Sequence, residues 1–248
     1  FLCDNDKEEK FHSLYMMSAA QAAGIKCKLI SSATNAATRT FETADAITWT
    51  DDGKFLQDDE GNIITTIWKT WSWRTALNQL ADDETLNFSA ASNVQRKHNG
   101  EKPKLVEILL HPSIRVFEPL WTVIPSSKAI LPILNLLKPN NPYLLKSTFE
   151  LTQDLIDSGY VTKPITGRAG GNVSLFSKSG SIIEKSSGKF EGDQDMYQEL
   201  CMLPKYENDY VQVCTWNVNG KHAGTVLRVD TCGIISFESS VYPLLVSN

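Results

Sequence analysis

The segment that most restricts how this chain can fold runs from Tyr160 to Phe176, YVTKPITGRAGGNVSLF. A short hydrophobic strand ends at Lys163, and after a proline a loop places Arg168 just before the adjacent glycines Gly170 and Gly171. A second apolar strand, VSLF, follows. Glycine allows a backbone to approach phosphate groups closely, and lysine and arginine heads neutralise phosphate charge. The pattern therefore predicts a loop that covers a polyphosphate, although a plain glycine-rich hairpin with two surface cations has the same pattern.

This loop differs from the Walker-type phosphate loop, because it joins two strands and lacks the GxxxxGK[ST] spacing. A second lysine is a further candidate. Lys128 lies in IPSSK, at the start of an apolar helix expected over 127–137 despite Pro132. Free backbone N–H groups and the helix dipole favour an anion there. Lys128 and Lys163 together fit a clamp on the α- and β-phosphates of ATP; a solvated first-turn lysine is the simpler interpretation of Lys128 alone.

The run from Tyr197 to Pro204, YQELCMLP, is the third candidate. We expect a short helix over DMYQEL that continues as an extended, partly apolar segment. Such a segment can offer backbone N–H and C=O groups to the edge of an adenine base, but a plain helix–strand junction explains the same residues. Arg228 closes the strand GTVLRVD. It either contacts phosphate or, as the safer default, pairs with Asp230 or a nearby glutamate.

Trp71 and Trp73 lie in a dense aromatic block, IWKTWSWRTA. Their spacing of two predicts that both indoles share one strand face or line a loop wall. Lys69, Arg74 and Thr75 are interleaved with them and suggest a pocket for a polar ligand. Core packing is the alternative, because tryptophan buries a large apolar area.

Four carboxylates gather near the start of the chain, at Asp4, Asp6, Glu8 and Glu9. Such a cluster can attract a polycation. It is also typical of a solvated helix start, because acidic side chains favour the first turn of a helix.

Composition excludes several classes of protein. The 248 residues are 42% apolar, enough for a core in one large domain or two joined lobes. The net charge of −5 is spread along the chain, so no nucleic-acid partner is expected. The longest apolar region, 129–137, is interrupted by a proline and is too short for a membrane span. The acidic first residues lack the features of a signal peptide.

Cysteine and histidine positions give no sign of a metal site. The five cysteines are scattered, without a CxxC motif, which predicts reduced, buried thiols in a cytoplasmic protein. The four histidines show no ligand spacing, so no Cys/His metal site is expected.

The hydrophobic pattern predicts an α/β region followed by an α+β region. A strand at the start, a helix over 8–23 that ends before Gly24, and a strand over 25–30 predict a small parallel sheet. Residues 31–46 are expected to be a loop or insertion, and 84–104 a polar connection. A short helix is expected over 150–159, and short strands dominate beyond it.

Seven separated blocks then occur in a familiar order: CDNDKEEKFH, WKTWSWRTA, FEPLWTVIPSSKAILPIL, YVTKPITGRAGGNV, SSGKF followed by YQEL, YVQVCTWNV and GTVLR. From about Leu2 to Val246 the chain resembles the synthetase domain of the glutathionylspermidine synthase family. This resemblance implies an ATP-grasp-like synthetase domain with a small pre-ATP-grasp-like α/β lobe. We expect the substrate-binding lobe over 1–120 and the nucleotide-binding lobe over 121–248.

The resemblance also implies a reaction. The family is expected to use ATP and magnesium to phosphorylate the glycine carboxylate of glutathione, after which an amine of spermidine attacks the acyl phosphate. A glutathione-like peptide and a spermidine-like polyamine are therefore the expected partners, with a homodimer left open. Such chemistry needs phosphate clamps, magnesium between the phosphates and a lid that excludes water.

The family's functional residues are carried over by motif. Those implied to bind ATP are Lys128, Lys163, Arg168, Gly170, Gly171, Gln198, Glu199, Leu200, Cys201, Gly233, Ile234 and Ile235. Arg168 is also the catalytic candidate, in the loop that resembles the phosphate-covering loop. Thr75 corresponds to a glutathione contact. Glu8 and Glu9 correspond to the acidic pair for the amine and peptide substrates, which agrees with the polycation interpretation.

Some family features are not found in these 248 residues. An R-x-D and an E-x-N element, which supply a phosphate arginine and the magnesium ligands, are missing, as is the amidase domain. We therefore expect a chain truncated at its N-terminus and inactive by itself. Ser240 stands where the family has an acidic residue on the polyamine side, which leaves the amine open. A non-catalytic nucleotide- or polyamine-binding module, or an inactive fragment, is the alternative.

Overall fold

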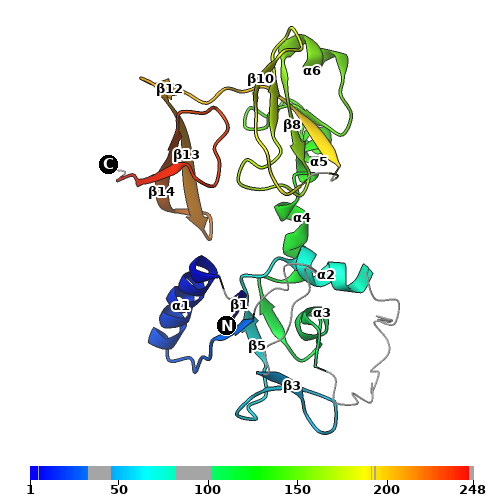
Figure 1. Ribbon diagram of the computed structural model, residues 1–248, viewed down its shortest axis with the longest axis vertical. Coiled ribbons are helices and arrows are strands. Elements are labelled where there is room, and N and C mark those ends of the chain that lie inside the picture. Colours follow the sequence, from blue (N-terminus) through cyan, green and yellow to red (C-terminus); the bar gives the residue numbers. More distant parts are fainter. Residues whose placement is uncertain (5, 33–45, 82–101, 191, 193, 246–248) are drawn as a thin grey trace. The chain divides into compact units, whose positions relative to one another are not determined.

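The computed structural model describes the chain except for residues 5, 33–45, 82–101, 191, 193 and 246–248 (Figure 1). It divides into two compact units, Phe1–Val123 and Ile124–Asn248. The boundary lies close to the predicted division between 120 and 121. Most of the predicted loop over 31–46 and of the polar connection over 84–104 lies outside the described residues.

The first unit combines short strands with helices. Its elements are β1 (Leu2–Asp4), α1 (Lys7–Ala22), β2 (Ile30–Ser32), β3 (Ile47–Trp49), β4 (Leu56–Asp58), β5 (Thr66–Trp68), α2 (Trp73–Ala81), α3 (Leu105–Leu109), β6 (Arg115–Phe117) and the 3-10 helix η1 (Leu120–Thr122). The pairs β1–β2 and β5–β6 are parallel, and β3–β4 is antiparallel. The predicted strand–helix–strand start with a parallel pair is therefore confirmed.

The second strand of that start begins later than predicted, at Ile30 rather than at residue 25. Its partner β1 is only three residues long, and their pairing begins at Leu2 with Ile30. Within the described part of the chain, the residues just before Ile30 pair with no strand. The carbonyl of Lys28 instead accepts a hydrogen bond of 2.8 Å from the backbone amine of Phe1.

The tryptophan block packs into the core of the first unit. Trp71 and Trp73 are 7% and 5% exposed and belong to a cluster with strand and helix residues of this unit. A shared strand face is wrong, because Trp73 is the first residue of α2. The Ser72 hydroxyl accepts a bond of 3.3 Å from the Thr75 amide and so satisfies an N–H group at the start of this helix. The core-packing alternative therefore holds.

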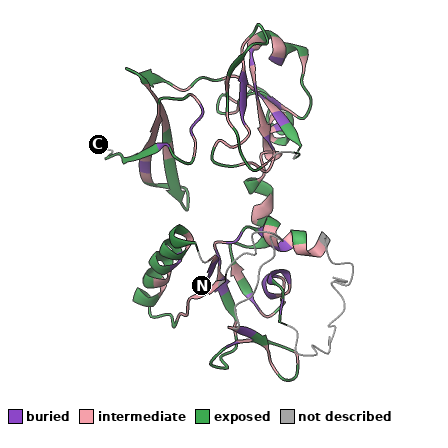
Figure 2. Cartoon of the chain, viewed as in Figure 1, coloured by how far each residue is buried: buried purple, intermediate pink, exposed green. Residues whose placement is uncertain are grey.

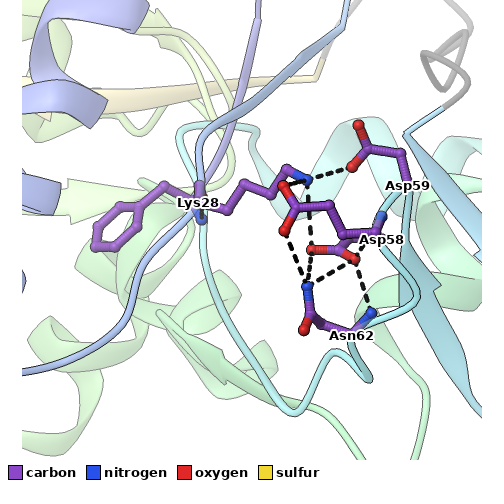
Figure 3. Close-up of polar contacts among 6 residues, drawn as sticks. Lys28, Asp58, Asp59 and Asn62 are labelled. Atoms are coloured by element: carbon purple, nitrogen blue, oxygen red, sulfur yellow. Dashed lines mark hydrogen bonds and ion pairs between the residues drawn. The ribbon is translucent and has the colours of Figure 1, made fainter.

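A lysine ties the chain before β2 to the β3–β4 hairpin. Lys28 Nζ pairs with Asp58 at 3.5 Å and with Glu60 at 2.9 Å, and it also contacts Asp59 (Figure 3). Asp58 is 8% exposed, and one of its oxygens accepts the backbone N–H groups of Glu60 and Asn62 at 3.0 and 2.8 Å. We call Lys28, Asp58, Asp59, Glu60 and Asn62 the Lys28 clasp.

Figure 2 shows the contrast between the helices of the first unit, with α1 mainly exposed and α3 largely buried. Asp6 precedes α1, and its carboxylate accepts the backbone N–H groups of Glu8 and Glu9 at 2.9 and 3.3 Å. The helix ends before Gly24, which has a φ of 82°. The helix and its glycine stop are confirmed, and the acidic cluster includes a true helix cap.

The second unit is mainly β, as the sequence predicts. Its elements are α4 (Val123–Ser126, which begins at the unit boundary), α5 (Ile130–Leu137), β7 (Ser147–Thr148), α6 (Gln153–Ser158), β8 (Tyr160–Pro164), β9 (Ser174–Phe176), β10 (Ile182–Lys185), β11 (Asp195–Glu199), β12 (Lys205–Tyr206), β13 (Asp209–Val218), β14 (Lys221–Asp230) and β15 (Ser240–Pro243). They form a five-stranded antiparallel sheet in the order β10-β9-β8-β11-β7 and a four-stranded antiparallel sheet in the order β12-β13-β14-β15.

The helix expected over DMYQEL is wrong, because these residues form β11 between β8 and β7. Met196 and Gln198 are buried while their neighbours are less so, which is the two-residue period of a strand. Good helix formers become a strand here because both edges of the segment are paired. The helix predicted over 150–159 is shorter, and it stops before Gly159, whose φ is 89°.

Among the described residues, no single helix has the length and apolar character to cross a membrane; one bent pair, Leu120–Ser126 with Ile130–Leu137, reaches them only when counted together. All five cysteines are described and free, but only Cys3 is buried, so the expectation of buried thiols holds for one of them.

Candidate functional site

The two predicted lysines come together beside the glycine loop. Lys163 is on β8, opposite Met196 of β11. Lys128 lies in the turn before α5, and its backbone N–H donates to the carbonyl of Ile165 at 2.8 Å, just beyond the end of β8. Lys128 is therefore not a solvated residue in the first helical turn. Its side chain is half-buried and turns back onto the loop.

The Lys128 ammonium is held by backbone carbonyls of the loop. Nζ donates to Pro164 O at 3.3 Å and also to Gly167 O. Burial lowers the pKa of Lys128 below its ordinary value. No carboxylate of the described residues forms a salt bridge with it. The charge is thus partly desolvated without a counter-ion from the described chain.

The second ammonium is held by a side chain. Lys163 Nζ donates to Gln198 Oε1 at 2.6 Å, across the β8–β11 pair. Burial and then the nearby charge of Lys128 lower the pKa of Lys163, and Cys201 acts weakly in the opposite direction. A partly buried ammonium that also lies near a second cation favours a bound anion.

The glycine loop has the backbone that its sequence predicts. Ala169, Gly170 and Asn172 have φ values of 51°, 70° and 56°. The hydroxyl of Ser186 donates to the carbonyl of Gly170 and accepts from the amide of Val173 at 2.9 Å. A side chain outside the loop therefore fixes its turn. Arg168, the catalytic candidate, is exposed at the start of this turn.

The run 233–235, whose three residues are predicted to bind ATP, packs against this loop. A Cβ at position 170 would lie 2.4 Å from the carbonyl oxygen of Ile235. Ile234 and Ile235 are each 8% exposed, and Ile234 is part of a buried cluster in the second unit. The amide of Gly233 donates to Glu184 Oε2 on β10 at 2.8 Å. The run is thus hydrogen-bonded to β10 at Gly233 and lies against the glycine loop at Ile235.

The adenine-edge candidates begin on β11 and leave it. The amides of Glu199 and Leu200 donate to the carbonyls of Lys146 and Gly159 at 2.8 and 3.1 Å, so these two donors are already used. Gln198 points its side chain toward Lys163. Cys201 follows the strand and is exposed. Further along the run, the carbonyl of Pro204 accepts from the amide of Val211 at 2.9 Å.

Arg228 does not form the predicted ion pair with Asp230 among the described contacts. Its guanidinium donates to the carbonyl of Ser236, which directly follows the run 233–235. Asp230 instead accepts from Ser239 Oγ at 2.6 Å and from the Cys232 amide at 3.1 Å. The side chain of Arg228 braces the return from β14 to β15 rather than forming a salt bridge with Asp230.

The residues implied to bind substrate are all in the first unit. Glu8 and Glu9 lie in the first turn of α1, where Glu8 is exposed and Glu9 half-buried. Thr75 is half-buried on α2, and its hydroxyl is 3.0 Å from the Ser72 hydroxyl. Within the described part of this unit, no hydrogen bond joins Thr75 to either glutamate.

Sequence reasoning missed three side chains that support the site: Ser147, Glu184 and Ser186. Each acts through a residue distant in sequence, so no local spacing marks it. Ser186 begins the block SSGKF and could have been suspected from its position in that block.

The described residues also bear on magnesium binding. Among the described residues, no group of three or more histidine, cysteine or acidic side chains could hold a metal ion. The described residues therefore do not fit a magnesium site.

Comparison with known proteins shows which family the chain matches. The family model described as glutathionylspermidine synthase preATP-grasp matches residues 1–247. The bifunctional glutathionylspermidine synthetase/amidase of Escherichia coli (strain K12) is 40% identical over 243 residues, which cover 98% of this chain and 37% of that protein.

Two relatives from Crithidia fasciculata are more distant. Its trypanothione synthetase is 34% identical over 96% of this chain and 34% of its own length. Its glutathionylspermidine synthase is 30% identical over 99% of this chain and 39% of its own length. The chain thus spans little more than a third of these relatives. Its mixed α/β structure with several small sheets fits the matched model, and the chain belongs to the glutathionylspermidine synthase preATP-grasp family.

Proposed function

We propose that the second unit binds ATP between its two sheets in the manner of an ATP-grasp domain. The observation that carries this proposal is the convergence of Lys128 and Lys163 beside the glycine loop, with burial lowering the pKa of both. Two partly desolvated ammonium groups without a carboxylate partner are destabilising unless an anion joins them. A polyphosphate would supply that anion, and the glycine backbone leaves room for it.

The other residues of the unit then take defined positions. Arg168 would cover the phosphates from the exposed side of the loop. Backbone groups beyond Leu200 would face the adenine edge. Ile234 and Ile235 would pack against the base or ribose while they hold the loop, because they are buried beside it.

We propose further that the chain is part of an ATP-dependent acid–amine ligase. The names of its relatives support this reaction class. The γ-phosphoryl group of ATP would pass to the glycine carboxylate of a glutathione-like peptide, giving an acyl phosphate and ADP. A polyamine nitrogen would then attack the carbonyl carbon, lose a proton and displace phosphate. Magnesium would neutralise phosphate charge in such a reaction.

The first unit would hold the two substrates. Glu8 and Glu9 carry negative charge on an accessible helix start, which suits a cationic amine. Thr75 would contact the peptide from α2. Asp6 is committed to capping α1, so it contributes by placing these two glutamates.

A non-catalytic nucleotide-binding module is the second candidate. It is favoured by one observation, that the described residues offer no cluster of metal ligands. ATP binding is common to both candidates, whereas turnover separates them. We expect the 248-residue chain to bind ATP and to release no phosphate by itself.

An ATP titration by calorimetry tests the shared part. Lys128→Met should weaken binding at least about tenfold, because a charge-assisted hydrogen bond to phosphate is lost. Lys178→Met is the matched control, since Lys178 is exposed in the turn after β9. Equal affinity of both variants would remove the proposal. Phosphate release that depends on glutathione and spermidine would overturn the expectation that the chain alone is inactive and would exclude the non-catalytic module.

A further inference from the structure

A buried serine lies behind the lysine of β8. Ser147, on β7, is 3% exposed, and Gln198, opposite it on β11, is 7% exposed. Gln198 Nε2 donates to Ser147 Oγ at 3.0 Å, while Gln198 Oε1 accepts from Lys163 Nζ at 2.6 Å. Three side chains from three adjacent strands thus form one chain of hydrogen bonds.

The two ends of this series of hydrogen bonds determine which group donates at each step. The Ser147 hydroxyl has a single proton, and it donates that proton to the carbonyl of Leu145 at 2.9 Å. Its oxygen can therefore only accept from Gln198, which requires the NH₂ end of the carboxamide. At the other end, the ammonium of Lys163 can only donate, which requires the oxygen end. Both ends impose the same orientation on Gln198.

We propose that Ser147 is a positioning residue of the nucleotide site: through the carboxamide of Gln198 it holds the Lys163 ammonium in place for a phosphate oxygen. This inference rests on the proposed ATP binding of the second unit. Ser147 does not touch the ligand itself. Its contribution is to prevent a half-turn of the carboxamide, which would point NH₂ protons at the ammonium.

The surroundings of Lys163 make this orientation important. Among the described residues, the charge of Lys128 lowers the pKa of Lys163, and Cys201 acts in the opposite direction. Gln198 supplies an oxygen acceptor, whereas a rotated amide would add a second repulsion. Without the hydroxyl of Ser147, the buried NH₂ group would also lose its partner, which favours rotation.

The main variant is Ser147→Ala, with Ser147→Thr as the conservative variant that keeps the hydroxyl. We expect Ser147→Ala to weaken ATP binding about fivefold, the effect of one lost hydrogen bond, and Ser147→Thr to restore most of the affinity. Thr148→Ala is the matched control, because Thr148 is the next residue of β7 and its hydroxyl bonds only locally, to Glu150 O at 2.7 Å. It should bind ATP as the wild type does. Ser147→Cys gives the same comparison if Ser147→Ala does not fold.

The pH dependence of binding is a readout that a purely structural role would not move. The charged form of Lys163 binds phosphate, so affinity is lost as pH rises through the pKa values of Lys163 and Lys128. Loss of the oxygen acceptor lowers the pKa of Lys163 further. The alkaline loss of ATP affinity should therefore begin at lower pH in Ser147→Ala than in the wild type or Thr148→Ala.

A double-mutant cycle with Gln198→Leu completes the test. If Ser147 acts through Gln198, adding Ser147→Ala to Gln198→Leu should change ATP affinity no further. An equal fold-loss in both backgrounds, or wild-type affinity and pH dependence in Ser147→Ala, would overturn the positioning role alone. Failure of the wild-type chain to bind ATP would instead overturn the proposed function, and this inference with it.

Discussion

Gly170 lies so close to the backbone carbonyl of Ile235 that a Cβ at position 170 would stand 2.4 Å from that oxygen. The contact joins the glycine loop to the run that leads from β14 toward β15. Two features therefore favour glycine at position 170: the close contact with Ile235 and the positive φ of 70°. The loop and the run 233–235 are therefore in direct contact.

Gly170→Ala should separate this contact from the effect of the positive φ. We expect it to lower the free energy of unfolding by more than the about 1–2 kcal/mol that a left-handed non-glycine residue costs, and to weaken ATP binding. Gly180→Ala is the control, because Gly180 has a φ of 76° and nothing within 4 Å of the added Cβ. Denaturant unfolding of both variants measures the difference. Equal losses of unfolding free energy in both variants would mean that the contact with Ile235 does not contribute to stability.

Lys163→Met should stabilise the unliganded protein while it removes ATP binding. The pKa of Lys163 is lowered from 10.5 in the folded chain, first by burial and then by Lys128. The unfolded state therefore binds more protons, and the penalty is complete below the folded pKa and relieved as pH rises toward 10.5. Urea unfolding at neutral pH should show the variant as more stable, with the gain shrinking at alkaline pH.

The control for that experiment is Lys178→Met, whose lysine is exposed. Its stability should follow the wild type at every pH. Saturating ATP should stabilise the wild type and leave Lys163→Met nearly unchanged, because ligand binding to the folded state alone raises stability. A destabilised Lys163→Met at neutral pH would show that the hydrogen bond to Gln198 outweighs the penalty of burial.

Glu184→Gln should change the chemistry of a neighbouring thiol. The hydrogen bond with Glu184 is the largest cause that raises the pKa of Cys232, and Glu184 Oε2 also accepts the amide of Gly233. A neutral glutamine keeps an acceptor and removes the charge, so the pKa of Cys232 should fall. Alkylation rates resolved by peptide mass spectrometry should rise at Cys232 and stay constant at exposed Cys201. An unchanged rate at Cys232 contradicts this contact.

The Lys28 clasp should contribute to the stability of the first unit under acid. Burial alone would raise the pKa of Asp58, but hydrogen bonds from Asn62 and Glu60 and the charge of Lys28 lower it below 3.8. Its contribution is fully present above 3.8 and is lost as pH falls through the lowered value. Asp58→Asn should therefore reduce stability near neutral pH and lose that difference in strong acid, as followed by circular dichroism.

A surface acid provides the comparison for Asp58. Asp52 pairs with Lys54 at 3.6 Å with both side chains more than half exposed. Asp52→Asn should have a smaller effect than Asp58→Asn, because exposed ion pairs contribute little. A larger effect of Asp52→Asn would contradict the role of the Lys28 clasp.

The sequence was most informative where chemistry and backbone conformation coincide. Gly170 could be predicted as a close-approach residue because few residues adopt its φ, and the helix stop at Gly159 follows from the same property. The strand character of the second unit follows from its short β-rich runs separated by turn residues. In contrast, β11 was expected as a helix, since only its pairing with β7 and β8 reveals a strand.

Tertiary contacts were the part that the sequence could not supply. Lys128 and Lys163 are far apart in the chain, and the Ser147–Gln198–Lys163 series joins three strands. Burial also decided the alternatives for Trp71 and Trp73, which no local spacing distinguishes. The roles of Glu8, Glu9 and Thr75 stay predictions from motif.

The central claim is that Lys128 and Lys163 meet the phosphates of ATP, and site-resolved acylation of lysines tests it most directly. The chain would be treated with an amine-reactive reagent at mildly alkaline pH, with ATP, with adenosine or with neither, and the peptides quantified by mass spectrometry. We predict that ATP protects Lys128 and Lys163 but not Lys178, and that adenosine protects neither, because it has no phosphate. Labelling of Lys128 and Lys163 that is the same with and without saturating ATP would contradict the account.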